Sequence, residues 1–176
     1  MAGVIDAKVY ENVTSSVDSD GIPAHGIWVI ANGGASADIA QIIYENKSYG
    51  CNMKGAVSVD ITTPSGVTFP ALFDRSTAEN LYIRFDIQPL SASAVFDQDI
   101  IKTFMVNNLT YKIGSYAETS SLTAVALAAI NSNGGGGVPV NMEISKNGTT
   151  WFDYLTPTTK DKEFAVDTTR IAITEL

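Results

Sequence analysis

The sequence predicts an α+β protein of two small lobes, each a mainly antiparallel sheet with one or two helices packed on one face. Runs of β-branched and aromatic residues occur in both halves, and segments with apolar residues at helical spacing interrupt them. Apolar residues make up 45% of the 176 residues, which is enough to build a buried core. The proline-containing stretch 89–94 is the predicted boundary, so the lobes cover residues 1–90 and 91–176.

Two strands are predicted to open the first lobe. Residues 4–10 favour a strand, and residues 25–30 form a continuous apolar run that suits a strand buried on both faces. Residues 18–23 contain Asp, Ser, Gly and Pro, which indicate a turn between these strands. The pair Gly33 and Gly34 is expected to end the second strand.

A helix is predicted next, from Ser36 to about Tyr49. Ser36 is a suitable N-cap, and the helix dipole favours the carboxylate of Asp38 in the first turn. Gly50 is expected to end the helix. The stripe predicted to be buried consists of Ile39, Ile42 and Ile43.

Three further strands are predicted at residues 56–62, 67–73 and 81–87, with a hairpin turn at residues 64–66. In the last strand, Arg84 and Asp86 alternate with three large apolar residues. We therefore expect that strand to have one buried face, formed by Ile83, Phe85 and Ile87.

The second lobe is predicted to start with two helices. Gly114 is expected to end the first helix, and Ser120 or Ser121 is expected to cap the second. Small residues in the second helix permit close packing against a neighbour. The apolar stripes are Ile100, Ile101, Phe104, Met105 and Leu109 in the first helix, and Leu122, Val125, Ala126, Ala129 and Ile130 in the second.

The predicted helices are followed by a flexible loop at residues 131–137, which ends in four consecutive glycines. Strand-like runs then occur at residues 140–145, 150–155 and 170–174. Asn147-Gly148 lies between the first two runs, and this dipeptide is a strong signal for a β-hairpin.

The charge and the cysteine content exclude several functions. The chain has 19 Asp and Glu residues against 11 Lys and Arg residues, and the net charge of −8 disfavours binding to nucleic-acid phosphates. Cys51 is the single cysteine, which excludes a disulfide within the chain and a cysteine-based zinc site. No apolar run approaches the roughly 18 residues of a membrane helix, and the first residues lack the pattern of a secretory signal. We expect no nucleic-acid or membrane partner.

Residue types that carry catalysis or bind metals are sparse. His25 is the single histidine, and a structural or exposed role at a strand entrance is the simpler interpretation. The pairs Asp18–Asp20, Asp97–Asp99 and Asp161–Glu163 lack the staged oxygen ligands of a calcium loop. The glycine-rich segments lack the spacing of phosphate-binding loops. The sequence therefore predicts no catalytic residue, no metal or cofactor site, and no enzyme.

Three aromatic residues form the candidate interaction surface. Trp151, Phe152 and Tyr154 flank the predicted hairpin turn, and alternation along a strand puts two of them on one side and one on the other. They pack either in the chain's own core or against a partner. Trp28 lies inside an apolar run and is expected in the core.

A series of short motifs runs from Val9 to Gly55, and a fainter continuation reaches the helix after Ser120. The motifs are Val9-Tyr10-Glu11-Asn12 with Thr14, Asp20-Gly21-Ile22-Pro23-Ala24-His25-Gly26-Ile27-Trp28, Gly33-Gly34, Asp38-Ile39-Ala40, Lys47, Gly50, Lys54-Gly55, Ile100-Ile101 and Ile113-Gly114. In order and spacing they resemble the baseplate J-like family of contractile-tailed phages. That family typically shows a Glu-Asn, a Gly-Ile-Pro with a following His, a Gly-Gly, an Asp-Ile-Ala helix start and a later glycine pair.

The resemblance implies a structural role in a tail baseplate wedge. The chain would correspond to the middle-to-C-terminal part of a full-length family member. Proteins of this family pair and join into a ring around the tail hub. This implies a homo-oligomer that contacts other baseplate wedge proteins, belongs to the virion, and is assembled in the host cytoplasm. The alternative hypothesis is a receptor- or carbohydrate-binding tail module that uses Trp151, Phe152 and Tyr154.

Overall fold

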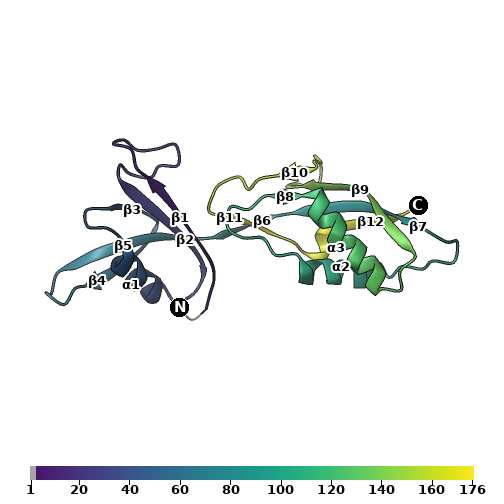
Figure 1. Cartoon of the computed structure of the whole chain (residues 1–176), viewed down its shortest axis with the longest axis horizontal. Helices are drawn as coiled ribbons and strands as arrows, with labels where there is room; N and C mark the ends of the chain where they lie inside the picture. The colour runs from purple at the N-terminus through teal and green to yellow at the C-terminus, as the bar shows by residue number, and fades with distance from the viewer. Residues whose placement is uncertain (1–2) are drawn as a thin grey trace. The chain divides into compact units, whose positions relative to one another are not determined.

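The chain folds into two units built from consecutive parts of the sequence (Figure 1). A computed structural model describes residues 3–176. The first unit ends at Thr77 and the second unit is Ala78–Leu176. Both units contain sheets with helices packed against them, so the predicted α+β class is confirmed.

The elements follow one another in this order: β1 (Val4–Asn12), β2 (Gly26–Gly33), α1 (Ser36–Asn46), β3 (Asn52–Lys54), β4 (Val57–Thr62), β5 (Thr68–Arg75), β6 (Thr77–Asn80), β7 (Tyr82–Pro89), α2 (Gln98–Asn108), β8 (Ala117–Glu118), α3 (Thr119–Ser132), β9 (Gly137–Ser145), β10 (Tyr154–Leu155), β11 (Lys162–Ala165), a 3₁₀ turn (Thr168–Arg170) and β12 (Ile171–Glu175).

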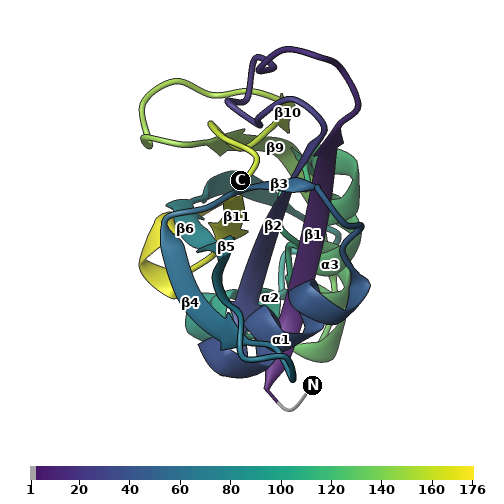
Figure 2. The ribbon, with the colours of Figure 1, turned by 90° about the vertical axis from the view of Figure 1, so that its left-hand side faces the viewer.

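The first unit is a mixed sheet with α1 on one face. The strand order is β1-β2-β5-β4, and β3 also pairs with β2 (Figure 2). β1 with β2 and β4 with β5 are antiparallel, whereas β2 is parallel to both β3 and β5. Ile39 and Ile43 of α1 pack on Val29, Ala31 and Phe73 of the sheet.

The limits of α1 differ from the prediction. Ala35, and not Ser36, is the N-cap residue, and it provides no side-chain hydrogen bond. The helix ends at Asn46, because Lys47 is already extended, so Gly50 lies in a later turn and not at the helix end. Ile42, expected in the core, is only partly buried.

A tight turn at Gly33 and Gly34 connects β2 to α1. Both residues have positive φ, and a Cβ on Gly33 would lie 2.2 Å from the carbonyl oxygen of Gly3. The guanidinium of Arg75 donates hydrogen bonds to the carbonyl oxygens of Gly33 and Gly34 and to Oγ of Ser36. Arg75 therefore gives the backbone acceptors of this turn a charged donor.

The second unit is built around β7. This strand pairs in parallel with β12 and antiparallel with β9, and α2 and α3 pack against the sheet. The predicted buried face is confirmed, since Ile83, Phe85 and Ile87 are at most 2% exposed. The core also contains Leu81, Ile101, Met105, Leu122, Ala126, Ala129, Ile130, Met142, Ile144, Phe164 and Ile171.

The two helices of the second unit exist but begin and end at other residues than predicted. α2 starts after Asp97, whose carboxylate accepts hydrogen bonds from the backbone amides of Asp99 and Ile100. It ends at Asn108, so Gly114 does not terminate it. Ile100 is 52% exposed, which removes it from the predicted buried stripe. α3 begins at Thr119, and neither predicted serine caps it.

The predicted hairpin at Asn147-Gly148 is only partly formed. The Asn147 side chain accepts hydrogen bonds from the amides of Thr149 and Thr150, which makes the turn. Beyond the turn, a single bridge joins Phe152 to Ile144, and residues 154–155 pair with β8 and not with β9. The prediction of a continuous strand over residues 150–155 is therefore wrong.

The division between the units precedes the expected boundary at Leu90. β7 reaches Pro89 and pairs with β9 along its length, which places it in the second unit. The segment after it also belongs there, because Leu90 donates to the carbonyl of Gly136 and Phe96 is buried in the core.

The phase of α2 gives a direct test. Ile101 is fully buried, so we expect Ile101→Ala to lower the free energy of unfolding by about 2–5 kcal/mol. Ile100→Ala, its neighbour on the exposed side, should change it by less than about 1 kcal/mol. Urea unfolding followed by circular dichroism measures both, and equal losses would contradict the phase described here.

The turn at Gly33 and Gly34 should depend on Arg75. Arg75→Ala leaves the two carbonyl groups without their charged donor and should cost about 2 kcal/mol. Lys112→Ala is the control, because it removes the same charge from an exposed residue and should change the free energy of unfolding by less than about 1 kcal/mol. The comparison uses the same unfolding measurement, and an Arg75 variant as stable as the control variant would exclude this role.

Candidate functional site

Exposed aromatic side chains gather around the short β8–β10 pair of the second unit. Ala117 and Leu155 are opposite each other in this pair and both are buried. Their neighbours Tyr116 and Tyr154 point the other way, as alternation requires, and are 53% and 51% exposed. The two rings lie 5.2 Å apart between centroids with 32° between their planes. We call Tyr116, Phe152 and Tyr154 the aromatic patch.

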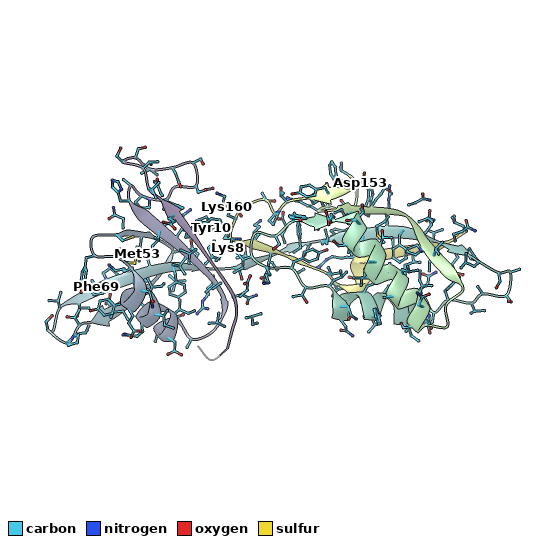
Figure 3. All side chains as sticks on the ribbon, in the orientation of Figure 1. Lys8, Tyr10, Met53, Phe69, Asp153 and Lys160 are labelled. Atoms are coloured by element: carbon cyan, nitrogen blue, oxygen red, sulfur yellow. The ribbon has the colours of Figure 1, made fainter. Side chains whose placement is uncertain are left out.

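The three aromatic residues proposed from the sequence have different environments. Phe152 and Tyr154 are 48% and 51% exposed, so neither is a core residue. Trp151 is partly buried beneath Arg84, whose guanidinium carbon lies 4.2 Å from the ring centroid. Arg84 also donates to Oε2 of Glu143 at 2.7 Å, which holds the guanidinium over the indole. Asp153, labelled in Figure 3, is exposed next to β10, and its carbonyl oxygen accepts a hydrogen bond from the amide of Thr119.

Sequence reasoning missed Tyr116. It precedes a strand of only two residues, which is too short to show an apolar alternation. The sequence offers only an apolar residue, Ala117, next to the aromatic Tyr116. This pattern does not predict an exposed ring unless β10 is known to pair with β8.

A second candidate surface is an apolar groove of about 650 Å³ in the first unit. Its walls are β1, β2, α1 and the segment 47–51, and its apolar lining includes Ala7, Val9, Ile27, Val29 and Ile42. Val9 is 56% exposed, whereas the buried sheet residues that pack against α1 belong to β2, β4 and β5. The volume is within the range of ligand sites, but we find no convergent set of charged side chains among its lining residues.

His25 and Cys51 also line this groove. His25 is exposed and has φ +52°; its backbone amide donates to the carbonyl of Thr14, and its carbonyl accepts from Asn52. This agrees with the structural or exposed interpretation. Trp28 is buried, as expected, and its Nε1 donates to Oδ2 of Asp74 at 2.7 Å while Lys54 lies over its ring.

Two of the carboxylates that the sequence singled out, those of Asp18 and Asp97, accept hydrogen bonds from backbone amides. Asp18 accepts hydrogen bonds from the amides of Asp20 and Ile22, and Asp97 caps α2. Within residues 3–176, no three His, Cys, Asp or Glu side chains come close enough to hold a metal ion. None of the helices in that range has the length and apolar character that crossing a membrane requires.

Three titratable groups of the second unit have shifted pKa values. Hydrogen bonds from the hydroxyl and the amide of Thr169 lower the pKa of the exposed Asp167. Burial raises the pKa of Tyr111 to about 12. For Glu79, burial raises the pKa, but hydrogen bonds from the Thr158 hydroxyl and amide and the charges of Lys146 and Lys162 outweigh it, so the pKa is lowered. The Lys146 ammonium lies 3.5 Å from Oε1 of Glu79. These contacts attach the segment after β10 to β6.

No protein-family model matches this chain, and no curated protein sequence matches it. The relation to baseplate J-like proteins stays a prediction from the motifs.

Acid should weaken the attachment at Glu79. A carboxyl whose pKa is lower in the folded state stabilises the fold above its unfolded-state pKa, near 4.3, and loses that contribution as the pH falls through the folded-state pKa. We expect the free energy of unfolding to fall more steeply below about pH 4.3 for the wild type than for Glu79→Gln. Urea unfolding from pH 3 to pH 7 measures the slopes, and identical slopes would show that Glu79 has no such role.

Proposed function

We propose that this protein is a non-catalytic structural component of a phage tail baseplate wedge. It acts through self-association and through contacts with other baseplate wedge proteins, and it is assembled into the virion tail in the host cytoplasm. The observation that carries the proposal is the aromatic patch, where Tyr116, Phe152 and Tyr154 are each about half exposed. Aromatic residues are enriched at protein interfaces because a rigid ring buries a large area at a low entropic cost.

The arrangement of the patch supports a protein partner. Tyr154 lies in β10 and Tyr116 directly precedes β8, and their buried neighbours Leu155 and Ala117 face each other in this strand pair, which limits the movement of both rings. A surface that is ordered before binding loses little conformational entropy when a partner docks. The exposed Asp153 and partly exposed Glu118 beside the rings provide a polar rim.

The motifs from Val9 to Gly55 give independent support. Several of them shape the backbone of the first unit, since Asn12 holds the connection to β2, and Gly33 and Gly34 form the turn before α1. Motifs that specify turns are expected to persist in a family of structural proteins, because those turns set the backbone path.

Genetic complementation tests the proposal in a contractile-tailed phage that encodes this chain. Without the chain we expect particles whose baseplates are incomplete in electron micrographs. The wild type and the control Leu90→Ser, a change at another exposed residue of the second unit, should restore them. The double variant Phe152→Ser, Tyr154→Ser should not, because it removes two rings of the patch.

Complete baseplates in the absence of the chain would refute the proposal. Both substituted residues are half exposed, so the purified double variant should unfold within about 1–2 kcal/mol of the wild type, which separates loss of contact from loss of fold.

The second candidate function is a receptor- or carbohydrate-binding tail module. The specific observation in its favour is the neighbouring pair of exposed rings, Tyr116 and Tyr154. A glycan array with the wild type and Tyr154→Ala decides it, because binding by the wild type that is lost in the variant supports this function, and no binding by either excludes it.

A further inference from the structure

β1 is an edge strand of the first unit. It ends the order β1-β2-β5-β4, and among residues 3–176 we find only β2 paired with it. Most of its residues are exposed, including Ile5 at 76% and Val9 at 56%. An edge strand presents backbone N–H and C=O groups in a row, and such a row is a template for another strand.

The residues of β1 are complementary to themselves about Ala7. When two copies pair antiparallel with Ala7 opposite Ala7, Lys8 of one copy faces Asp6 of the partner subunit, and the two-fold axis repeats this contact. β1 has an irregularity in its pairing between Val4 and Asp6, so the Asp6–Lys8 contacts lie in the part of the strand that is regular from Asp6 onward. Opposite charges in facing positions are among the cross-strand pairs that stabilise sheets.

The charges of β1 favour this register over its neighbours. Centring the pair on Asp6 or on Lys8 would place like charges directly opposite each other. Centring it on Val9 would place Lys8 opposite Tyr10 and Ala7 opposite Glu11, which leaves no pair of opposite charges. The Ala7 register is therefore the one in which the charges of the strand match.

The apolar groove lies on the same face of the sheet as Ala7 and Val9. Ala7 and Val9 pair with Ala31 and Val29, which pack under α1, whereas Lys8 and Tyr10 belong to the opposite face (Figure 3). A two-fold axis perpendicular to the sheet keeps both α1 helices on one face, with the two β1 strands between them. The exposed wall of the groove, including Val9 and the partly buried Ile42, then faces its own symmetry mate.

We propose that β1 is the self-association surface of this protein, and that its occupant is β1 of a second copy, antiparallel and centred on Ala7. The two sheets join into one continuous sheet, and the apolar groove is covered from both sides. The inference rests on the self-association in the proposed function and names the surface that carries it.

Disulfide trapping tests the register. In a Cys51→Ser background, which removes the native thiol, Ala7→Cys should form a disulfide-linked dimer under mild oxidation. Directly opposite residues have Cβ atoms about 4.5–5.5 Å apart, close to the geometry of a disulfide. Val9→Cys is the matched control, because two copies of residue 9 would be about 13 Å apart along the strands and should not cross-link. Absence of the Ala7 cross-link, or an equal yield from Val9→Cys, overturns the proposal.

Charge exchange tests the complementarity, with sedimentation velocity as the measurement. Lys8→Glu should weaken dimerisation about tenfold, since two attractive pairs become repulsive. The double variant Asp6→Lys, Lys8→Glu restores opposite charges at the same positions and keeps the net charge at −8, so it should restore dimerisation. Lys102→Glu changes the net charge as Lys8→Glu does, but it lies on α2 and should have no effect. A double variant as weak as the single one overturns the proposal.

The outcome is separable from that of the proposed function. A chain that is monomeric at every concentration and forms no cross-link refutes pairing through β1, while the complementation experiment depends on the aromatic patch of the second unit. If the purified chain dimerises through β1, and phage that lack the chain still assemble complete baseplates, then the dimer surface is supported and the baseplate role is refuted.

Discussion

The buried side chain of Asn12 is the constraint on which the first unit depends most. It is 4% exposed, and its Nδ2 donates to the carbonyl oxygens of Ser16, Ile22 and Pro23, while its Oδ1 accepts from the amide and hydroxyl of Thr14. A buried amide is costly unless its hydrogen bonds are made. Asn12 therefore fixes the long connection between β1 and β2, and with it the register in which these two strands pair.

The motifs that resemble baseplate proteins and the surfaces proposed for contact are encoded by different residues. Asn12, Gly33 and Gly34 set the backbone path in the first unit, and none of them presents a large side chain for a partner. The aromatic patch lies in the second unit, outside the clearest motifs. A relative with the same turns and different aromatic residues would therefore keep the fold and change its partner.

Sequence patterns predicted the elements that combine length with a clear period. The alternation in β7, the β4–β5 hairpin and the stripe of α3 are confirmed, because each buries one face along several residues. β6, β8 and β11 have two to four residues, which is too short for a period to appear. Residues 150–155 have strand-forming composition, but pairing decides the outcome, and Leu155 finds its partner on β8. For the same reason, Phe152 and Tyr154 were identifiable from the sequence as a candidate surface, whereas Tyr116 was not.

The parallel pairing of β12 with β7 has a consequence for synthesis on the ribosome. The first unit uses only residues up to Thr77, so its sheet is complete while the ribosome is still translating the second unit. In the second unit, β7 pairs with β12 only after Ile171, the partner of Ile83, has been synthesised near the end of this sequence. Contacts between residues so distant in the sequence form slowly, and the edge of β7 that pairs with β12 stays open until then. Chaperones that recognise nascent chains would therefore meet this protein at β7, with its amino-terminal sheet already folded.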